Sequence, residues 1–459
     1  MEDNTLLYQW GLVIISSLIL IFISPLAKSF TDFYKGSRKE QKPNFYLLTS
    51  SLVISWLFAK SITNSANLGL DFGIVGGVAY ACYYMSFITA GIVIYQLRKK
   101  GGFLSIHHFL KSKFGRGAII LFSVLICFRL FNEIWSNTIV IGSYFGEPGS
   151  MGYLWSIIIF TLMTLWYSLK GGMSSSIMTD VIQFIFFAVL LVVILSVILP
   201  KTDGGVEAIL TSGEWGWSTG VNLIFVGLVQ CISYPFHDPV MTDRGFISDI
   251  KTTLKSFLWA GVIGAISIIL FSFVGIYGAQ EGVSGQAPVE VSKLLGVSMT
   301  LLVNFIMITS AASTLDSSFS SFSKLTILDL KVVKKPTIKS GRLMMVLLTI
   351  CGTIPVFLNP TVLSATTVSG TMVIGLAPIF MLWKMKAPKI SFYASIIMGI
   401  TWGFVLVFGW FPEELYFTSG KHAELLTVNV LGTLSCFIVF VTPALLTKNK
   451  AFMPQLEGI

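Results

Sequence analysis

Apolar runs of about twenty residues recur from end to end of this 459-residue chain, and a run of that length spans the hydrocarbon core of a bilayer. The chain is 54% hydrophobic and 12% charged, and its mean hydropathy of +0.81 excludes an ordinary soluble domain. The predicted spans are 6–27, 45–69, 72–97, 118–143, 151–169, 175–199, 220–240, 256–279, 298–328, 341–358, 361–383, 391–411 and 424–446. The sequence therefore predicts an all-α polytopic membrane protein, with about thirteen transmembrane helices in one domain that covers residues 1–459.

Basic residues predict how these helices are oriented. Clusters of Lys and Arg follow the first, third, ninth, eleventh and last predicted helices, whereas the loops of the other side carry only Lys201, Lys293 and Lys421. The positive-inside rule then places the N-terminus outside and the C-terminus in the cytoplasm, which requires an odd number of helices. We expect a multi-pass protein of the plasma (inner) membrane. The net charge of +9 follows this topology and does not indicate a nucleic-acid partner.

Motifs typical of enzymes are not evident in the sequence. No nucleophile with a base, glycine-rich phosphate loop or metal-binding cluster is recognisable, so we expect neither an enzyme nor a cofactor. All five cysteines fall within predicted spans, and none forms a CxxC pair. We interpret them as buried apolar residues.

Two predicted helices are interrupted by polar or helix-breaking residues. The second span contains "SWLFAKSITNSANLG", and the seventh contains "SYPFHDPV". Such stretches persist at membrane depth where they line a cavity or are buried in protein. The two are five helices apart, which is typical of secondary transporters built from two inverted five-helix repeats. Ordinary kinks at Pro and Gly are the alternative interpretation.

A stripe of hydroxyl groups marks the ninth predicted helix. Ser310, Ser313, Thr314, Ser317 and Ser321 are spaced so that a helix places all of them on one face. Within a membrane these groups bond back to their own helix, bridge to another helix, or offer oxygen to an ion. Packing through small residues and an ion site are both compatible with the stripe.

Three motifs resemble those of the sodium/solute symporter family. They are "GGMSSSIMTDVIQF", "SAASTLDSSFSSFSKLTILDL" and "FLKSKFG", and "SWLFAKSITNSANLG" is faintly similar to the urea-transporter branch. The resemblance implies a LeuT-type fold with a 5+5 inverted repeat, one helix before the core and two after it. The implied parts are a leading helix and loop at 1–44, repeats at 45–199 and 220–384, and the last two helices at 390–447.

The resemblance also implies a sodium site between the interrupted second helix and the hydroxyl-bearing ninth helix. Its ligands would be the backbone carbonyls of Ala59, Ile62 and Ser310 and the hydroxyls of Ser313 and Thr314. Sodium is a hard cation, and oxygen ligands of these kinds suit it. Sodium is the only metal that the resemblance implies.

A second ion would use carboxylates that lie within the predicted membrane helices. In some members of the family, the equivalents of Asp180 and Ser317 hold a second sodium, and Asp316 lies beside them. The alternative for Asp180 is a cap or hydrogen bond to a neighbouring helix. Lys60 departs from the family pattern, because its ammonium could occupy the ion site, pair with a carboxylate or extend away.

The solute is expected near the midplane, between the two interrupted helices. The candidate residues are neutral donors and acceptors with one imidazole, which suits a small polar solute: Asn64, Ser65, Asn67, Gln230, Ser233, Tyr234 and His237. Helix–helix hydrogen bonds are the alternative role for each of them. Arg129 and Glu133 lie four residues apart and are expected to pair, either as a structural ion pair or in contact with a zwitterionic solute.

These observations predict a secondary active transporter that imports a small polar solute with sodium by alternating access. A proton-coupled or uncoupled transporter of the same fold, with Lys60 in place of the ion, is an alternative. A solute sensor that does not transport is another, and a channel is disfavoured because no loop carries a repeated carbonyl motif.

Overall fold

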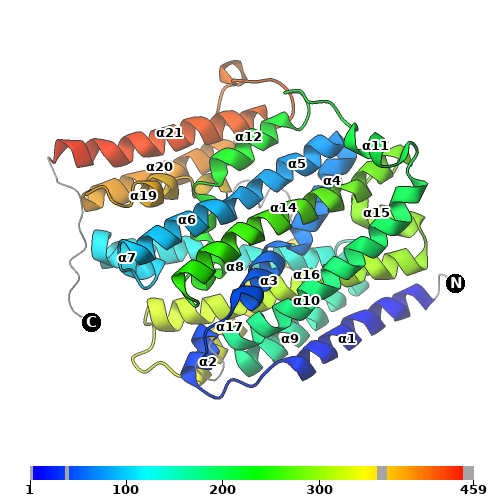
Figure 1. Cartoon of the computed structure of the whole chain (residues 1–459), viewed down its shortest axis with the longest axis horizontal. Helices are drawn as coiled ribbons and strands as arrows, with labels where there is room; N and C mark the ends of the chain where they lie inside the picture. Colours follow the sequence, from blue (N-terminus) through cyan, green and yellow to red (C-terminus); the bar gives the residue numbers. More distant parts are fainter. Residues whose placement is uncertain (1–3, 37–40, 359–369, 448–459) are drawn as a thin grey trace.

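A computed structural model describes residues 4–36, 41–358 and 370–447 of the chain. The long helices run along the longest axis of the molecule, in a bundle (Figure 1). The start of α1 (Thr5–Ile23) and the end of α21 (Ala423–Leu446) lie at opposite ends of this axis.

Ten helices of the described residues are long and apolar enough to cross a membrane, which makes the protein a multi-pass membrane protein. Besides α1 and α21, they are α5 with η2 and α6 (Ile74–Ala81, Cys82–Tyr84, Met85–Lys99), α8 (Arg116–Gly142), α9 (Met151–Gly171), α10 (Met173–Ile198), α14 (Ile250–Gln280), α16 (Val297–Lys324), α17 (Ile338–Thr353) and α20 (Lys389–Val407). The shorter elements are α2 (Phe30–Lys35), α7 (Ile106–Phe114), α11 (Gly205–Leu210), α15 (Ala287–Leu294) and α19 (Leu376–Met381).

Both helices that were predicted to be interrupted are interrupted in the structure. The second span consists of α3 (Phe45–Trp56) and α4 (Ala59–Phe72), which are bent by 59° at the break. The seventh span consists of α12 (Val221–Gln230), the 3₁₀ turn η4 (Tyr234–His237) and α13 (Pro239–Arg244). The eleventh predicted span, 361–383, begins outside the described residues, and its described part contains α19.

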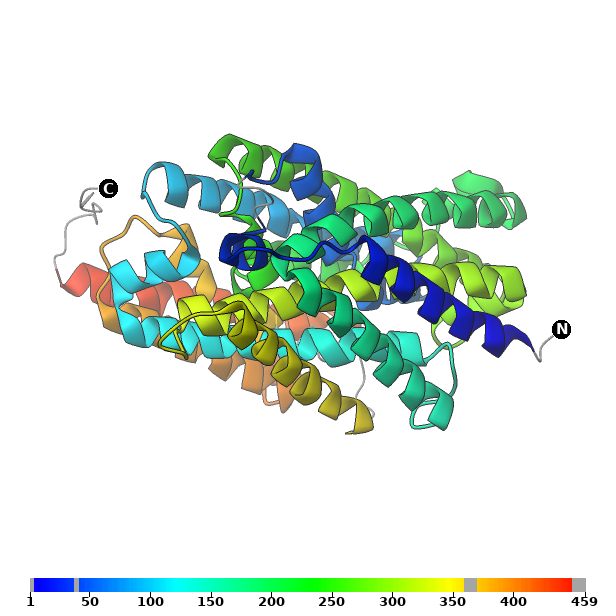
Figure 2. The ribbon, with the colours of Figure 1, turned by 90° about the horizontal axis from the view of Figure 1, so that it is seen from below.

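Helix α16 occupies the interior of the bundle. Every residue from Ile306 to Ser323 is buried, because α16 packs against α8, α9, α10, α3 and α1. Helices α20 and α21 lie on one side of the bundle, and α1, α9 and α17 lie on the opposite side (Figure 1 and Figure 2). Large apolar side chains cover the outer surface, among them Phe22, which is 88% exposed, and Val192, which is 67% exposed. A lipid environment accommodates such an exterior.

Small residues hold α4 tightly against α14. The Ser65 hydroxyl donates to the carbonyl of Ile268 at 2.7 Å. A Cβ atom at Gly275 would lie only 1.7 Å from the carbonyl oxygen of Ala66, so only glycine fits this approach of the two backbones. The close contact sets the direction in which α4 continues after the break.

Candidate ion and solute site

The break between α3 and α4 is stabilised by side chains of neighbouring helices. Phe58 has an extended conformation, with φ −57° and ψ 147°, which interrupts the ladder of helical hydrogen bonds. The Tyr84 hydroxyl donates to the carbonyl of Trp56 at 2.8 Å, and the amide N–H of Lys60 donates to Oδ1 of Asn137 at 3.2 Å. Backbone groups that a break frees inside a membrane need such partners.

Other carbonyls at the break remain without donors. Among the described residues, no N–H or side chain donates to the carbonyl oxygens of Ile54, Ser55 or Leu57. The predicted carbonyl ligands are placed differently, because Ala59 and Ile62 lie in the first turn of α4. The carbonyl of Ala59 already accepts the hydroxyl of Thr63 at 3.0 Å. The free carbonyls therefore lie at the end of α3 and not at the start of α4.

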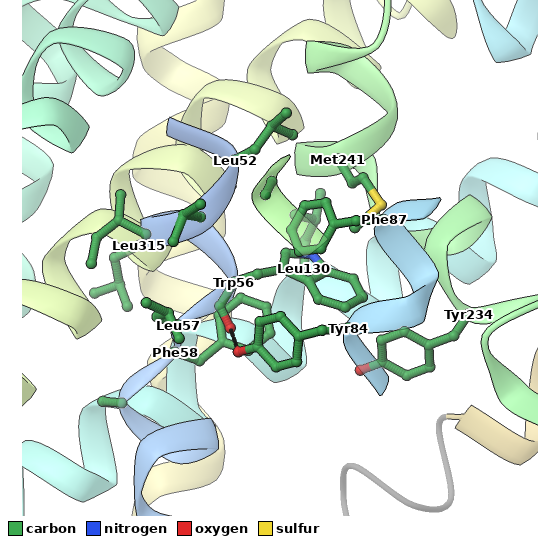
Figure 3. Packing of buried hydrophobic residues seen from close by; sticks show 14 of the residues in the cluster. Leu52, Trp56, Leu57, Phe58, Tyr84, Phe87, Leu130, Tyr234, Met241 and Leu315 are labelled. Atoms are coloured by element: carbon green, nitrogen blue, oxygen red, sulfur yellow. Dashed lines mark hydrogen bonds between the residues drawn. The ribbon is translucent and has the colours of Figure 1, made fainter. Parts of the chain in front are cut away.

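The hydroxyl-bearing face of α16 lies beside this break. The hydroxyls of Ser55 on α3 and Ser317 on α16 are 3.2 Å apart. Figure 3 shows Leu57 on the side of the break that faces Leu315, while Trp56 lies on the other side with Tyr84. Ser317 follows Ser313 and Thr314 by one turn of α16, so the end of α3 meets α16 next to these two hydroxyls.

The predicted hydroxyl ligands are buried on α16 and have defined partners. The Ser313 hydroxyl donates to Oδ1 of Asp180 at 2.5 Å, and the Thr314 hydroxyl donates to the carbonyl of Ser310 at 3.0 Å. The hydroxyl of Ser310 has no partner among the described residues. Each donating hydroxyl keeps oxygen lone pairs that a cation can use.

An arginine fills the place predicted for a second ion. The Arg244 guanidinium, at the end of α13, lies 2.9 Å from Oδ2 of Asp180 and 2.8 Å from the hydroxyl of Ser317. It also donates to the hydroxyls of Ser51 at 2.5 Å and Ser176 at 3.2 Å. Arg244 and Asp180 are both 0% exposed. The sequence analysis missed this residue, although an arginine beside a broken membrane helix was a signal for it.

The second carboxylate of the predicted ion site is held by hydrogen bonds. Asp316 accepts from Tyr167 at 3.0 Å, Ser176 at 2.8 Å and Thr179 at 2.9 Å. Ser176 thus contacts both Asp316 and Arg244. Five helices, α3, α9, α10, α13 and α16, are joined through this network.

Lys60 is directed away from α16. Its ammonium donates to Glu133 at 2.8 Å and to Ser136 at 3.1 Å, both on α8. Arg129 also pairs with Glu133, and its guanidinium lies 3.2 Å from Asp238. The expected Arg129–Glu133 pair is therefore present within a buried cluster of two cations and two anions.

Asp238 is a second residue that the sequence analysis missed. Its carboxylate caps α13 by accepting the backbone N–H groups of Val240 at 2.9 Å and Met241 at 3.2 Å. It also accepts from the indole N–H of Trp56 at 2.9 Å. An Asp-Pro pair at the start of a helix is a capping signal that could have found it.

An aromatic cavity lies between the two interrupted helices. It is lined by Trp56, Phe58, Lys60, Ser61, Leu68, Tyr80, Tyr83, Tyr84, Leu223, Tyr234 and His422. In Figure 3, Tyr234 lies across from Tyr84 on the side of the break away from α16. Of the seven predicted solute residues, only Tyr234 lines this cavity.

The other predicted solute residues are not among those that line the cavity, and most bond to backbone or to other helices. Oδ1 of Asn67 accepts the N–H of Ala287 at 2.8 Å, and Nε2 of Gln230 donates to Asn429 at 2.8 Å. Ser65 bonds to α14, and Ser233 donates to the carbonyl of Gln230 at 3.2 Å. Nδ1 of His237 lies 2.5 Å from the carbonyl of Tyr234, and Nδ2 of Asn64 has no partner among the described residues.

A second hollow lies toward α2 and α7. Its lining includes Tyr34, His107, Asp243, Lys324 and Asp329. Lys324 pairs with Asp243 on α13 and lies 3.4 Å from Asp329. These contacts and the Arg244 network attach α13 to the C-terminal half of α16.

Comparison with known proteins finds similarity in structure alone. No family model matches the chain, and no curated protein sequence matches it. A sodium-coupled sialic acid symporter in a substrate-bound outward-open state has a TM-score of 0.74 at 17% identity, with 98% of this chain and 99% of that chain covered.

Two other solved transporters are similar over most of their length. Mhp1, a nucleobase-cation-symport-1 family transporter in a closed conformation, has a TM-score of 0.58 at 12% identity and covers 91% of this chain and 95% of its own. MhsT in complex with L-phenylalanine has a TM-score of 0.57 at 13% identity and covers 91% of this chain and 99% of its own. The chain therefore has the LeuT-type fold of these symporters.

Proposed function

We propose that this chain is a secondary active transporter that imports a small solute together with sodium by alternating access. The observation that carries the proposal is that the end of α3, with backbone carbonyls that lack donors, packs against the hydroxyl-bearing face of α16. The carbonyls of Ile54, Ser55 and Leu57 belong to the end of α3, where the Ser55 hydroxyl lies 3.2 Å from that of Ser317, and Ser317 follows Ser313 and Thr314 by one turn of α16. Carbonyl and hydroxyl oxygens are what a hard cation needs once it has lost its water.

The proposed sodium ligands differ in part from those that the sequence suggested. We retain the hydroxyls of Ser313 and Thr314 and the carbonyl of Ser310. The carbonyls at the end of α3 replace those of Ala59 and Ile62, because no donor reaches the former among the described residues. Asp180 supports the site indirectly. It accepts a hydrogen bond from the Ser313 hydroxyl and so orients the lone pairs of that oxygen.

The transporter is proposed to carry a single sodium ion in each cycle. Arg244 already supplies a positive charge between Asp180 and Ser317, where a second ion would lie. A sodium ion at the same place would be repelled by the guanidinium at close range and low dielectric.

The alternative in which Lys60 replaces the ion loses support from the geometry. The Lys60 ammonium bonds to Glu133 and Ser136 on α8 rather than to the hydroxyls of α16. In the described structure, the Lys60 ammonium therefore does not compete with sodium beside Ser313 and Thr314.

The distribution of charge supports an orientation for transport. The basic loops flank α2 and α7, so the positive-inside rule favours a cytoplasmic location for that end and an outside location for the N-terminus. The aromatic cavity includes His422 from the opposite end. We propose that α13 closes the path between the cavity and the cytoplasm. It is attached to α10 by the Arg244–Asp180 pair and to α16 by the Lys324–Asp243 pair.

The test is sodium-specific stabilisation followed by sodium-driven uptake. Thermal unfolding of the purified protein in NaCl and in KCl of equal ionic strength should give a higher midpoint in sodium, which rises with concentration as a binding equilibrium requires. Solutes that stabilise the protein further would then be tested in proteoliposomes with an inward sodium or potassium gradient. Equal stability in both salts, or equal uptake under both gradients, would reject sodium coupling.

A further inference from the structure

The composition of the cavity wall narrows the class of solute. Six of the residues that line it carry benzene or indole rings: Trp56, Phe58, Tyr80, Tyr83, Tyr84 and Tyr234. The ring of Tyr234 is 5.7 Å from that of Trp56 and 6.2 Å from that of Tyr83, and Tyr83 is 5.6 Å from Tyr80. Neighbouring rings thus form a continuous aromatic wall between the two interrupted helices.

We propose that the solute is a zwitterion that joins a quaternary ammonium group to a carboxylate, as glycine betaine does. The inference rests on the proposed function, of which it names the substrate class. The negative faces of several aromatic rings attract an alkylated ammonium group, and this attraction is largest where water is excluded.

The aromatic lining distinguishes a quaternary ammonium from other solutes. A sugar, urea or a primary ammonium carries donors that each need an acceptor once water is lost. In the lining, the Tyr80 hydroxyl is bonded to Ser61 and the Tyr84 hydroxyl to a backbone carbonyl, so among the described residues the hydroxyls of Tyr83 and Tyr234 are the tyrosine hydroxyls left for a solute. A quaternary ammonium has no N–H donor, so aromatic faces alone can replace its water.

Lys60 and Ser61 provide an anchor for the carboxylate. Both line the cavity. The Lys60 ammonium has three donors, of which two bond to Glu133 and Ser136, so one remains for the solute within the described structure. Ser61 accepts the hydroxyl of Tyr80 at 3.1 Å, and its own O–H has no acceptor among the described residues.

The buried charges favour a solute without net charge. Lys60, Arg129, Glu133 and Asp238 together carry two positive and two negative charges, so a zwitterion leaves the balance intact. The Arg129 guanidinium lies 5.4 Å from the ring of Phe58 and 5.3 Å from that of Tyr234. The ammonium group is therefore expected against Trp56, Tyr83 and Tyr84, with the carboxylate at Lys60.

Three matched ligands test the two halves of the solute separately. Glycine betaine carries both charges, 3,3-dimethylbutanoate has the same shape without the positive charge, and choline lacks the carboxylate. Binding to the full-length purified protein in NaCl is measured by calorimetry. Glycine betaine is expected to bind at least about tenfold more tightly than either analogue. Equal affinity for glycine betaine and 3,3-dimethylbutanoate, or no binding of glycine betaine, would overturn the proposal.

Variants at Tyr83 separate recognition from stability. The Tyr83 hydroxyl makes no hydrogen bond among the described residues, so Tyr83→Phe keeps the ring and should keep the affinity for glycine betaine. Tyr83→Leu should lower the affinity for glycine betaine about tenfold and leave the affinity for 3,3-dimethylbutanoate unchanged. Equal losses for both ligands would show that the ring only maintains the shape of the cavity, which contradicts the proposal.

Failure of this inference is distinguishable from failure of the proposed function. If sodium stabilises the protein and another class of solute is taken up under a sodium gradient, the substrate class is wrong and the function stands. If glycine betaine binds equally in NaCl and in KCl and sodium has no effect of its own, sodium coupling is wrong and the recognition site stands.

Discussion

The guanidinium of Arg244 lies 2.9 Å from the carboxylate of Asp180, and neither side chain is exposed. Asp180 also accepts the hydroxyl of Ser313 at 2.5 Å. One carboxylate therefore connects the end of α13 to the hydroxyl that we assign to sodium. Movement of α13 during transport would change the partners of Asp180 and, through it, the orientation of Ser313.

We predict that Arg244→Met strongly destabilises the protein. The change leaves the charge of Asp180 buried without a cation, which costs about 3–5 kcal/mol. Denaturant or thermal unfolding in detergent measures the loss. The double variant Arg244→Met, Asp180→Asn removes both charges and should recover a large part of the stability. A single variant as stable as the parent would show that the pair contributes nothing.

Ser313→Ala and Thr314→Ala should each weaken the sodium dependence far more than they reduce expression. Each change removes one proposed ligand, so the sodium concentration for half-maximal stabilisation should rise about tenfold or more. Ser320→Ala is the matched control, because Ser320 is also buried on α16 and donates to the carbonyl of Asp316 at 2.9 Å. An unchanged sodium response in both ligand variants would exclude this site.

Lys60→Met is expected to keep the preference for sodium over potassium. The Lys60 ammonium faces α8, and its removal does not open or fill the space beside Ser313. The variant should be less stable, because Glu133 loses one of its two cationic partners and keeps only Arg129. Unfolding midpoints in the two salts test both statements. Loss of the sodium preference would instead place the ammonium near the ion.

Stability should rise with pH through Lys113, which lies on the short helix α7. Burial lowers the pKa of Lys113 to about 7, and its ammonium donates to the carbonyl of Trp383 at 2.7 Å. Between that value and the ordinary lysine pKa near 10.4, the unfolded chain binds more protons than the folded protein, so the free energy of unfolding increases with pH.

The variant Lys113→Met removes this contribution. We expect the gain in stability from pH 7 to pH 9.5 to be smaller by more than about 1 kcal/mol than in the parent. Lys111→Met is the control, since Lys111 lies on the same helix and is exposed. The prediction is wrong if both variants follow the pH profile of the parent.

Much of the architecture was predictable because a bilayer restricts the choices of a chain. Apolar runs of sufficient length become helices, and polar residues within them mark places where the helix is buried or broken. The breaks near Phe58 and Pro235, and the burial of the Ser313 face, follow from these rules. The division into repeats at 45–199 and 220–384 remains a prediction.

The partners of the polar side chains were not predictable in the same way. Asn67 and Gln230 have groups suited to a solute, but they bond to Ala287 and Asn429, which are distant in sequence. The predicted carbonyl ligands, those of Ala59 and Ile62, lie after the break and not at it. The position of a break depends on side chains from other helices, such as Tyr84 and Asn137.

The sequence by itself determined that this chain is a multi-pass helical protein with two broken helices and a buried stripe of hydroxyls. Only the tertiary structure decided that Arg244 lies where a second ion was expected, that Lys60 faces Glu133, and that aromatic rings line the cavity. The physical reason is that hydrophobic length and helical spacing are local properties of the chain. The neutralisation of a buried charge depends on which distant residue reaches it.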